Sequence, residues 1–103
     1  MTIDKINIKS QLDSMKDLWA FKNIGKVNNH SVRLIKMKGE YEMHKHDNGD
    51  KMFFVVEGTL FLEFNNHKTL EINEGEFIKV PKGFEHKPYS QDEVSLMVFE
   101  PES

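Results

Sequence analysis

The chain has 103 residues, of which 38% are hydrophobic and 30% are charged, which is typical of a globular domain and not of a disordered chain. Its 14 Lys and Arg against 17 Asp and Glu give a net charge of −3, which argues against nucleic-acid binding because that needs a basic face. The chain has no cysteine, so any metal must be held by histidine, carboxylate or water. We expect residues 1–103 to form one domain.

The N-terminal sequence MTIDKINIKS lacks the apolar core of a signal peptide, and the chain has no apolar run of membrane-spanning length. We therefore expect a cytoplasmic protein that works without a membrane or a nucleic acid as partner.

The first predicted element is a short helix or turn near residue 10. Ser10-Gln11-Leu12-Asp13 resembles a capping box with Asp in place of Glu. Leu12, Met15 and Trp19 then recur at roughly helical spacing. Trp19 could cap the mouth of a barrel or lie in the core, and we expect it in the core.

From Trp19 onward the pattern changes to short runs that are typical of β-strands. Asn28-Asn29 predicts a tight turn between strands over residues 21–27 and 31–38. Further turn signals rich in Gly, Asn and Pro then recur every eight to ten residues as far as Gln91-Asp92. This spacing predicts an all-β sandwich or barrel.

Alternation of apolar residues identifies the candidate core of this β fold. The residues that should share an inward face are Leu60, Leu62 and Phe64 on one strand and Val94, Leu96 and Val98 on the last strand. The run at residues 52–56 is apolar on both faces, so one face can fill the barrel while the other meets a second sheet or subunit. We expect a homodimer.

Two histidines one residue apart, His44 and His46, are the unusual local chemistry of the chain. On an extended strand they would project to the same side, roughly 6–7 Å apart. His86 follows a Pro81-Lys82-Gly83 turn, and antiparallel strands could bring it alongside. Three neutral imidazoles with open coordination positions suit Zn, Fe, Ni, Cu or Mn. By itself, the pair of histidines is equally consistent with a polar surface.

The residues around these histidines resemble the two motifs of the cupins. These are Gly39-x4-His44-x-His46-x4-Lys51-x6-Gly58 and Gly75-x5-Pro81-x-Gly83-x2-His86-x3-Ser90. The resemblance implies a jelly-roll β-barrel, commonly dimeric, with a divalent metal inside it. The implied ligands are His44, His46 and His86, together with a glutamate. The chain is also similar to short cupins often labelled mannose-6-phosphate isomerase-like, which is a likeness of fold and not evidence of that reaction.

The chain departs from the cupin pattern in three places. Four residues separate Gly39 from His44 where five are usual, and Ser90 stands where asparagine is frequent. More importantly, Lys51 occupies the position of the glutamate ligand. A lysine ammonium has no lone pair and cannot bind a cation unless it first loses its proton.

Three arrangements around Lys51 remain open. Lys51 can turn away from a metal held by three histidines, with water in the vacant position. Alternatively, Glu42 replaces the missing carboxylate, since it has the strand parity of His44 and His46, whereas Asp50 should turn outward. In the third arrangement no metal binds, and Lys51, paired with Glu42, holds an anionic ligand.

The corresponding functions are also open. One is a metal-dependent enzyme acting on a small organic substrate, such as an isomerase or a dioxygenase, with Zn, Fe, Ni or Mn as cofactor. Lys51 would then be a catalytic group that binds a substrate carboxylate or phosphate or acts as a base. Another is a metal-free module that binds or senses a small anionic or sugar-like molecule, and a third is a dimerising scaffold. Besides Glu42, we expect the ligand cavity to be lined by Phe53, Val55 and Phe84.

Overall fold

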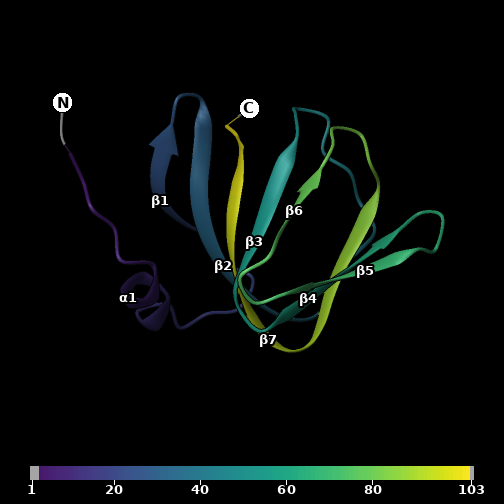
Figure 1. The fold of residues 1–103 in the computed structure, drawn as a ribbon, viewed down its shortest axis with the longest axis horizontal. Helices are drawn as coiled ribbons and strands as arrows, with labels where there is room; N and C mark the ends of the chain where they lie inside the picture. The colour runs from purple at the N-terminus through teal and green to yellow at the C-terminus, as the bar shows by residue number, and fades with distance from the viewer. Residues whose placement is uncertain (1–2, 103) are drawn as a thin grey trace.

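The computed structural model describes residues 3–102, and Figure 1 shows a sheet-rich fold with one short helix beside it. The helix is not long and apolar enough to cross a membrane, and the part of the chain that is described has no other helix. The expectation of an all-β fold with a short N-terminal helix is confirmed. The elements are α1 (Ile8–Asp13), β1 (Lys22–Val27), β2 (His30–Glu40), β3 (Lys51–Glu57), β4 (Thr59–Phe64), β5 (Thr69–Asn73), β6 (Phe77–Val80) and β7 (His86–Pro101).

All the strand pairings are antiparallel, and the last strand holds the architecture together. The main path runs β1-β2-β7-β3-β6, with β5 paired to β4 and β4 paired to β7. Figure 1 shows the β4–β5 hairpin standing at an angle to the other strands. Because β7 inserts between β2 and β3, residues near the C-terminus lie beside strands from the first half of the chain, around one interior.

β7 reaches across both parts of this arrangement because it is 16 residues long. Its start pairs with β4, from His86 opposite Phe64 to Tyr89 opposite Phe61. Tyr89 also pairs with Glu40 of β2, and the rest of β7 continues along β2 and β3. A single strand shared in this way curls the sheet around a common core, as a jelly roll requires.

The core contains the residues that alternation predicted. Leu60, Leu62, Val94, Leu96 and Val98 are fully buried, and Phe64 is partly buried against them. In β3, Phe53 and Val55 point inward while the residues between them are only half-buried on the outer face. Residues 52–56 thus have one face that fills the interior, as predicted, and one half-buried outer face.

The start of the helix differs from the expectation. Asn7, and not Ser10, is the N-cap, and its Oδ1 accepts the N–H of Ser10 at 2.9 Å. Asn is as good a cap as Ser, and Asn7 has the extended backbone that a cap needs. The helix ends at Asp13, so Trp19 lies beyond it and is 36% exposed instead of being a core residue.

The predicted strand through the two histidines is also wrong. β2 ends at Glu40 and β3 begins at Lys51, and the segment between them is a loop with an isolated bridge between His44 and His86. Strand parity therefore does not decide where the side chains of this loop point. Tyr41 in this loop is 47% exposed, and its ring meets the ring of His44 edge-on, with centroids 5.1 Å apart.

Candidate metal centre

The loop at residues 41–50 is attached by backbone hydrogen bonds to the segment that begins β7. The N–H of His44 donates to the carbonyl of His86 at 2.9 Å, and the N–H of His86 donates back to His44 at 2.8 Å. The N–H of Gly83 donates to the carbonyl of His46 at 2.8 Å. The two sequence motifs are therefore joined directly, although about forty residues of chain separate them.

Gly83 has a conformational reason to be glycine in the turn that delivers His86. Its φ is +81°, in the left-handed region that side chains with a Cβ disfavour. In the same turn the N–H of Lys82 donates to Oδ1 of Asp50 at 2.9 Å, which holds Asp50 at the surface.

The three predicted metal ligands form one cluster. The candidate ligand atoms of His44, His46 and His86 lie within 4.8 Å of one another. The centroid separations are 4.9 Å for His44–His46, 4.5 Å for His44–His86 and 5.4 Å for His46–His86. His86 is fully buried, whereas the other two are half-buried and face the solvent side. The fold thus gathers the three imidazoles around one point.

Hydrogen bonds orient two of these rings for ligation through Nε2. Nδ1 of His44 lies 2.9 Å from the carbonyl of Glu42, and Nδ1 of His86 lies 3.0 Å from the carbonyl of Phe84. A carbonyl can only accept, so each Nδ1 must carry the proton and each Nε2 has a free lone pair. Nε2 of His86 is buried and has no hydrogen-bond partner among residues 3–102.

Burial favours the neutral form of His46 and His86. It lowers the pKa of His46 to about 4, with the positive charge of Lys51 as the next contribution. Burial also lowers the pKa of His86, and the hydrogen bond to Phe84 offsets only part of that effect. Neutral imidazoles are the form that binds a metal.

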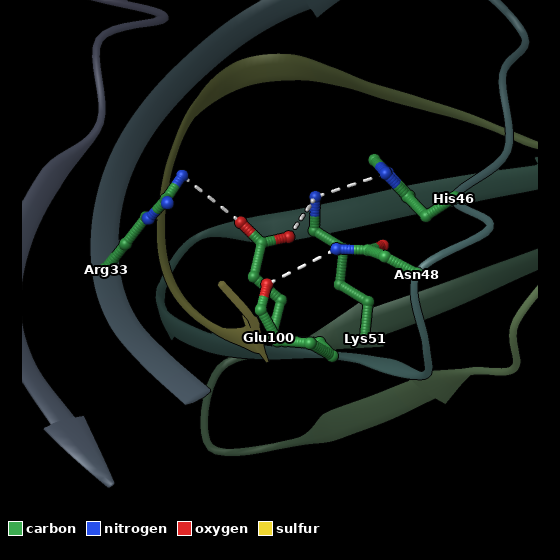
Figure 2. Close-up of polar contacts among 6 residues, drawn as sticks. Arg33, His46, Asn48, Lys51 and Glu100 are labelled. Carbon is green, nitrogen blue, oxygen red and sulfur yellow. Dashed lines mark hydrogen bonds and ion pairs between the residues drawn. The ribbon is translucent and has the colours of Figure 1, made fainter. Parts of the chain in front are cut away.

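Lys51 lies at the edge of the histidine cluster and is 6% exposed. Its Nζ lies 3.3 Å from Nε2 of His46 and 3.1 Å from Oε2 of Glu100 (Figure 2). Nζ also lies 5.1 Å from the ring centre of Phe53 and 5.8 Å from that of Phe21. Lys51 has therefore not turned away: its ammonium is held inside by an ion pair, a hydrogen bond and two aromatic faces.

The carboxylate partner of Lys51 is Glu100, which was not among the residues expected at the site. Glu100 also pairs with Arg33, from Oε1 to Nη1 at 3.3 Å, so it lies between two cations (Figure 2). Met52 pairs with Phe99, which makes Lys51 and Glu100 neighbours across β3 and β7. The sequence carried a signal, because Glu100 continues the inward alternation of Leu96 and Val98.

The residues expected around the cavity do not all meet there. Glu42 is exposed and contributes only its carbonyl, as the acceptor for His44. Val55 is fully buried in the core, and Phe84 is 55% exposed. Phe53 does line the cavity. None of Glu42, Val55 and Phe84 is among the residues that surround it.

The cavity has a volume of about 460 Å³ and opens beside the histidines. Its ionisable groups near neutral pH are those of His44, His46 and Lys51, and Tyr41 and Trp19 add a hydroxyl and an indole N–H. The other lining side chains are apolar or aromatic, namely Trp19, Phe21, Ile35, Met37, Tyr41, Phe53, Pro88 and Val98. Such a cavity suits a small molecule with one polar end.

Trp19 belongs to this cavity for a reason that sequence spacing did not reveal. Its φ is +67°, which is rare for a bulky residue, and its N–H donates to the carbonyl of Lys36 at 2.8 Å. Nζ of Lys36 in turn donates to the carbonyl of Met15 at 3.1 Å. These bonds fasten the segment after α1 to β2. The indole of Trp19 stacks on Tyr41, with ring centres 5.7 Å apart.

Comparisons with known proteins agree with the β fold described above. The family described as "Cupin domain" matches residues 32–100. A cupin-2 domain containing protein from Shewanella frigidimarina has a similar crystal structure, with 33% identity, a TM-score of 0.90 and 93% of each chain covered. Protein NMB1881 from Neisseria meningitidis is 34% identical, with a TM-score of 0.89 over 95% of this chain and 99% of that one. Protein YdbB of Bacillus subtilis is 33% identical over 82% of this chain and 74% of its own length.

Proposed function

This chain belongs to the cupin family, and from that premise we propose that it binds a divalent metal through His44, His46 and His86 and uses it on a small molecule held in the adjacent cavity. The observation that carries the proposal is Nε2 of His86. This atom is buried without a partner, while Nδ1 of the same ring is bonded to a carbonyl. Burying a polar atom without a hydrogen bond is costly, and a metal would satisfy it.

The donor set fits a borderline divalent ion. Three neutral imidazoles with open positions suit Zn, Fe, Ni or Mn. When bound, such an ion polarises a carbonyl or activates water or oxygen, which is the chemistry of an isomerase or a dioxygenase. The candidate ligand atoms lie within 4.8 Å of one another, so the three rings would have to move closer together to share one ion.

Around this site the residues of the chain have separable tasks. The carbonyls of Glu42 and Phe84 accept hydrogen bonds from Nδ1 of His44 and of His86, which leaves Nε2 of each ring free for the metal. Lys51 places a positive charge and N–H donors at the cavity edge, where they can bind an acidic oxygen of the substrate or stabilise charge that develops on it. Glu100 holds that ammonium in place from the side of the core.

Metal analysis of untagged protein tests the metal site. The protein should contain, or take up on addition, close to one equivalent of Zn, Fe, Ni or Mn, and His86→Ala should abolish uptake. His67→Ala is the matched control, since the side chain of His67 is 90% exposed and outside the cluster. A folded protein that takes up none of these ions would refute the proposal.

A metal-free binding module is the second candidate, because the hydrogen bond from Lys51 already uses Nε2 of His46. Lys51→Glu separates the two candidates. If the wild type binds little metal and the variant binds it tightly, the natural site holds its ligand without a metal. If the wild type already binds tightly, the three histidines suffice.

We also propose a homodimer formed through the outer face of the main sheet. Half-buried apolar side chains alternate along this face on β3 and β7, and Phe77 on the neighbouring β6 is 63% exposed. Exposed apolar area of this kind is typical of an interface. Light scattering coupled to size exclusion should give twice the chain mass, and Phe77→Lys should shift it toward the monomer. A monomeric wild type at micromolar concentration would contradict this assembly.

A further inference from the structure

We propose that the cavity selects a small, planar and largely apolar molecule that carries one acidic oxygen, of the class of aromatic or conjugated carboxylates. This inference rests on the proposed function, since it takes the histidine end of the cavity as the place of reaction. It replaces the broader expectation of an anionic or sugar-like ligand with a defined chemistry.

The distribution of polar groups favours a ligand with one polar end over a sugar. His44, His46 and Lys51 lie together, and among the other lining side chains only Tyr41 and Trp19 carry a hydrogen-bonding group. A sugar has hydroxyls on every side, and most of them would lose water here without gaining a hydrogen bond. A molecule with a single polar end would leave only apolar surface against the rest of the cavity.

The charges at the polar end favour an anion. Lys51 and Arg33 share the single carboxylate of Glu100, so these three groups together carry one positive charge. An ammonium has three N–H donors, and the structure gives Nζ of Lys51 two acceptors, Glu100 and His46. The third donor can bind an oxygen of the ligand at the cavity edge.

The aromatic side chains favour a flat ligand. Trp19 and Tyr41 stack with an angle of 27° between their planes and form one wall of the cavity. Phe21 and Phe53 contribute two further rings. Planar conjugated ligands gain from offset stacking on such surfaces beyond the burial of their area.

The backbone of Trp19 supports independently that this cavity is a ligand site. A non-glycine residue at φ +67° is strained by about 1–2 kcal/mol, and such strain persists where the surroundings enforce it and clusters at ligand sites. Here the enforcing contact is the hydrogen bond from Trp19 to Lys36. The result is an indole placed at the cavity instead of in the core.

Binding of trans-cinnamate to metal-free protein tests the inference. Trp19 is the one tryptophan of the chain, so its fluorescence reports on the cavity itself. Cinnamate should quench this emission and bind at least about tenfold more tightly than 3-cyclohexylpropionate, its saturated and non-planar counterpart. Glucose 6-phosphate and the uncharged cinnamyl alcohol should bind more weakly than cinnamate.

Two variants, one inside the cavity and one outside it, show where cinnamate binds. Trp19→Leu removes the flat ring and should weaken cinnamate binding about two- to tenfold by calorimetry. Phe61→Leu changes a half-buried aromatic residue outside this cavity and should leave cinnamate binding unchanged. Thermal melting establishes that both variants are folded, and Lys51→Met supplies a second readout because it should remove the preference for cinnamate over cinnamyl alcohol.

Equal or tighter binding of the saturated acid or of glucose 6-phosphate would overturn the inference, as would unchanged cinnamate affinity in folded Trp19→Leu. Failure of the metal proposal is distinguishable, because cinnamate is measured without metal. Protein that takes up Zn²⁺ but ignores cinnamate fails only the present inference, and protein that binds cinnamate but no metal fails only the proposed function.

Discussion

Nζ of Lys51 lies 3.3 Å from Nε2 of His46, and this hydrogen bond uses the lone pair that a metal would need. The residue at the usual carboxylate position thus competes with the ion for one of the three imidazoles. Binding a metal requires that Lys51 release His46 while it keeps its ion pair with Glu100.

Lys51→Met should therefore raise the affinity for Zn²⁺. It removes a positive charge beside the ion and frees His46 from a charge-assisted hydrogen bond of about 1.5–3 kcal/mol, so we expect a gain of about tenfold or more. Calorimetric titration against a competing chelator measures the change. Lys79→Met, at a lysine whose side chain is 63% exposed, is the control and should have little effect. Equal Zn²⁺ affinity in wild type and Lys51→Met would show that Lys51 does not compete.

Glu100→Gln should destabilise the fold by about 3 kcal/mol, since it leaves the buried ammonium of Lys51 without its anionic partner. Urea unfolding followed by circular dichroism gives the free energy of unfolding. Glu102→Gln at the exposed pair with Lys26 is the matched control and should cost less than about 0.5 kcal/mol. The double variant Lys51→Met/Glu100→Leu should recover part of the loss, because the buried ammonium is then gone and only the partly exposed Arg33 lacks its carboxylate. Similar losses in Glu100→Gln and Glu102→Gln would sink this account.

The metal-free protein should lose stability as the pH falls from about 6.5 toward 4. The pKa of His46 is about 4 in the folded protein, whereas in the unfolded chain it returns to its ordinary value of 6.5. At a pH between these two values the imidazole of His46 is protonated in the unfolded chain and neutral in the folded protein, so protonation favours unfolding. The lowered pKa of His86 acts in the same direction.

Melting temperatures across this pH window test the effect. His46→Gln should flatten the dependence, while His67→Gln, at an exposed histidine, should not. A wild-type profile that stays level between pH 7 and 4.5 would contradict the burial argument.

Gly83→Ala should cost about 1–2 kcal/mol of stability and also weaken metal binding, because φ at this position is +81° and the turn delivers His86. Gly25→Ala is a matched control. A Cβ at either glycine would meet nothing within 4 Å, but only Gly83 of the two has a positive φ. Equal effects of the two substitutions on unfolding would argue against a conformational requirement at Gly83.

Local sequence was enough to predict most of the strands and their core residues. Leu60, Leu62, Leu96 and Val98 alternate with outward-facing residues, and the same periodicity decides which side chains are buried when the sheet closes. Local sequence was wrong for residues 41–50, which form a loop and not a strand. The resemblance to the two cupin motifs predicted which histidines would meet, because residues forty positions apart are brought together by the tertiary fold and not by local periodicity.

Partners across the sheet could not be found in this way. Glu42, in the preceding loop, was the predicted carboxylate partner of Lys51, but the partner is Glu100. The reason is that β7 inserts between β2 and β3 and so places Glu100 beside Lys51 and Arg33. Trp19 follows the same rule: helical spacing suggested a core residue, and a hydrogen bond to β2 turned it toward the cavity. Periodicity along one strand is a local property of the chain, whereas the pairing of charges and the walls of a cavity depend on contacts that only the closed barrel creates.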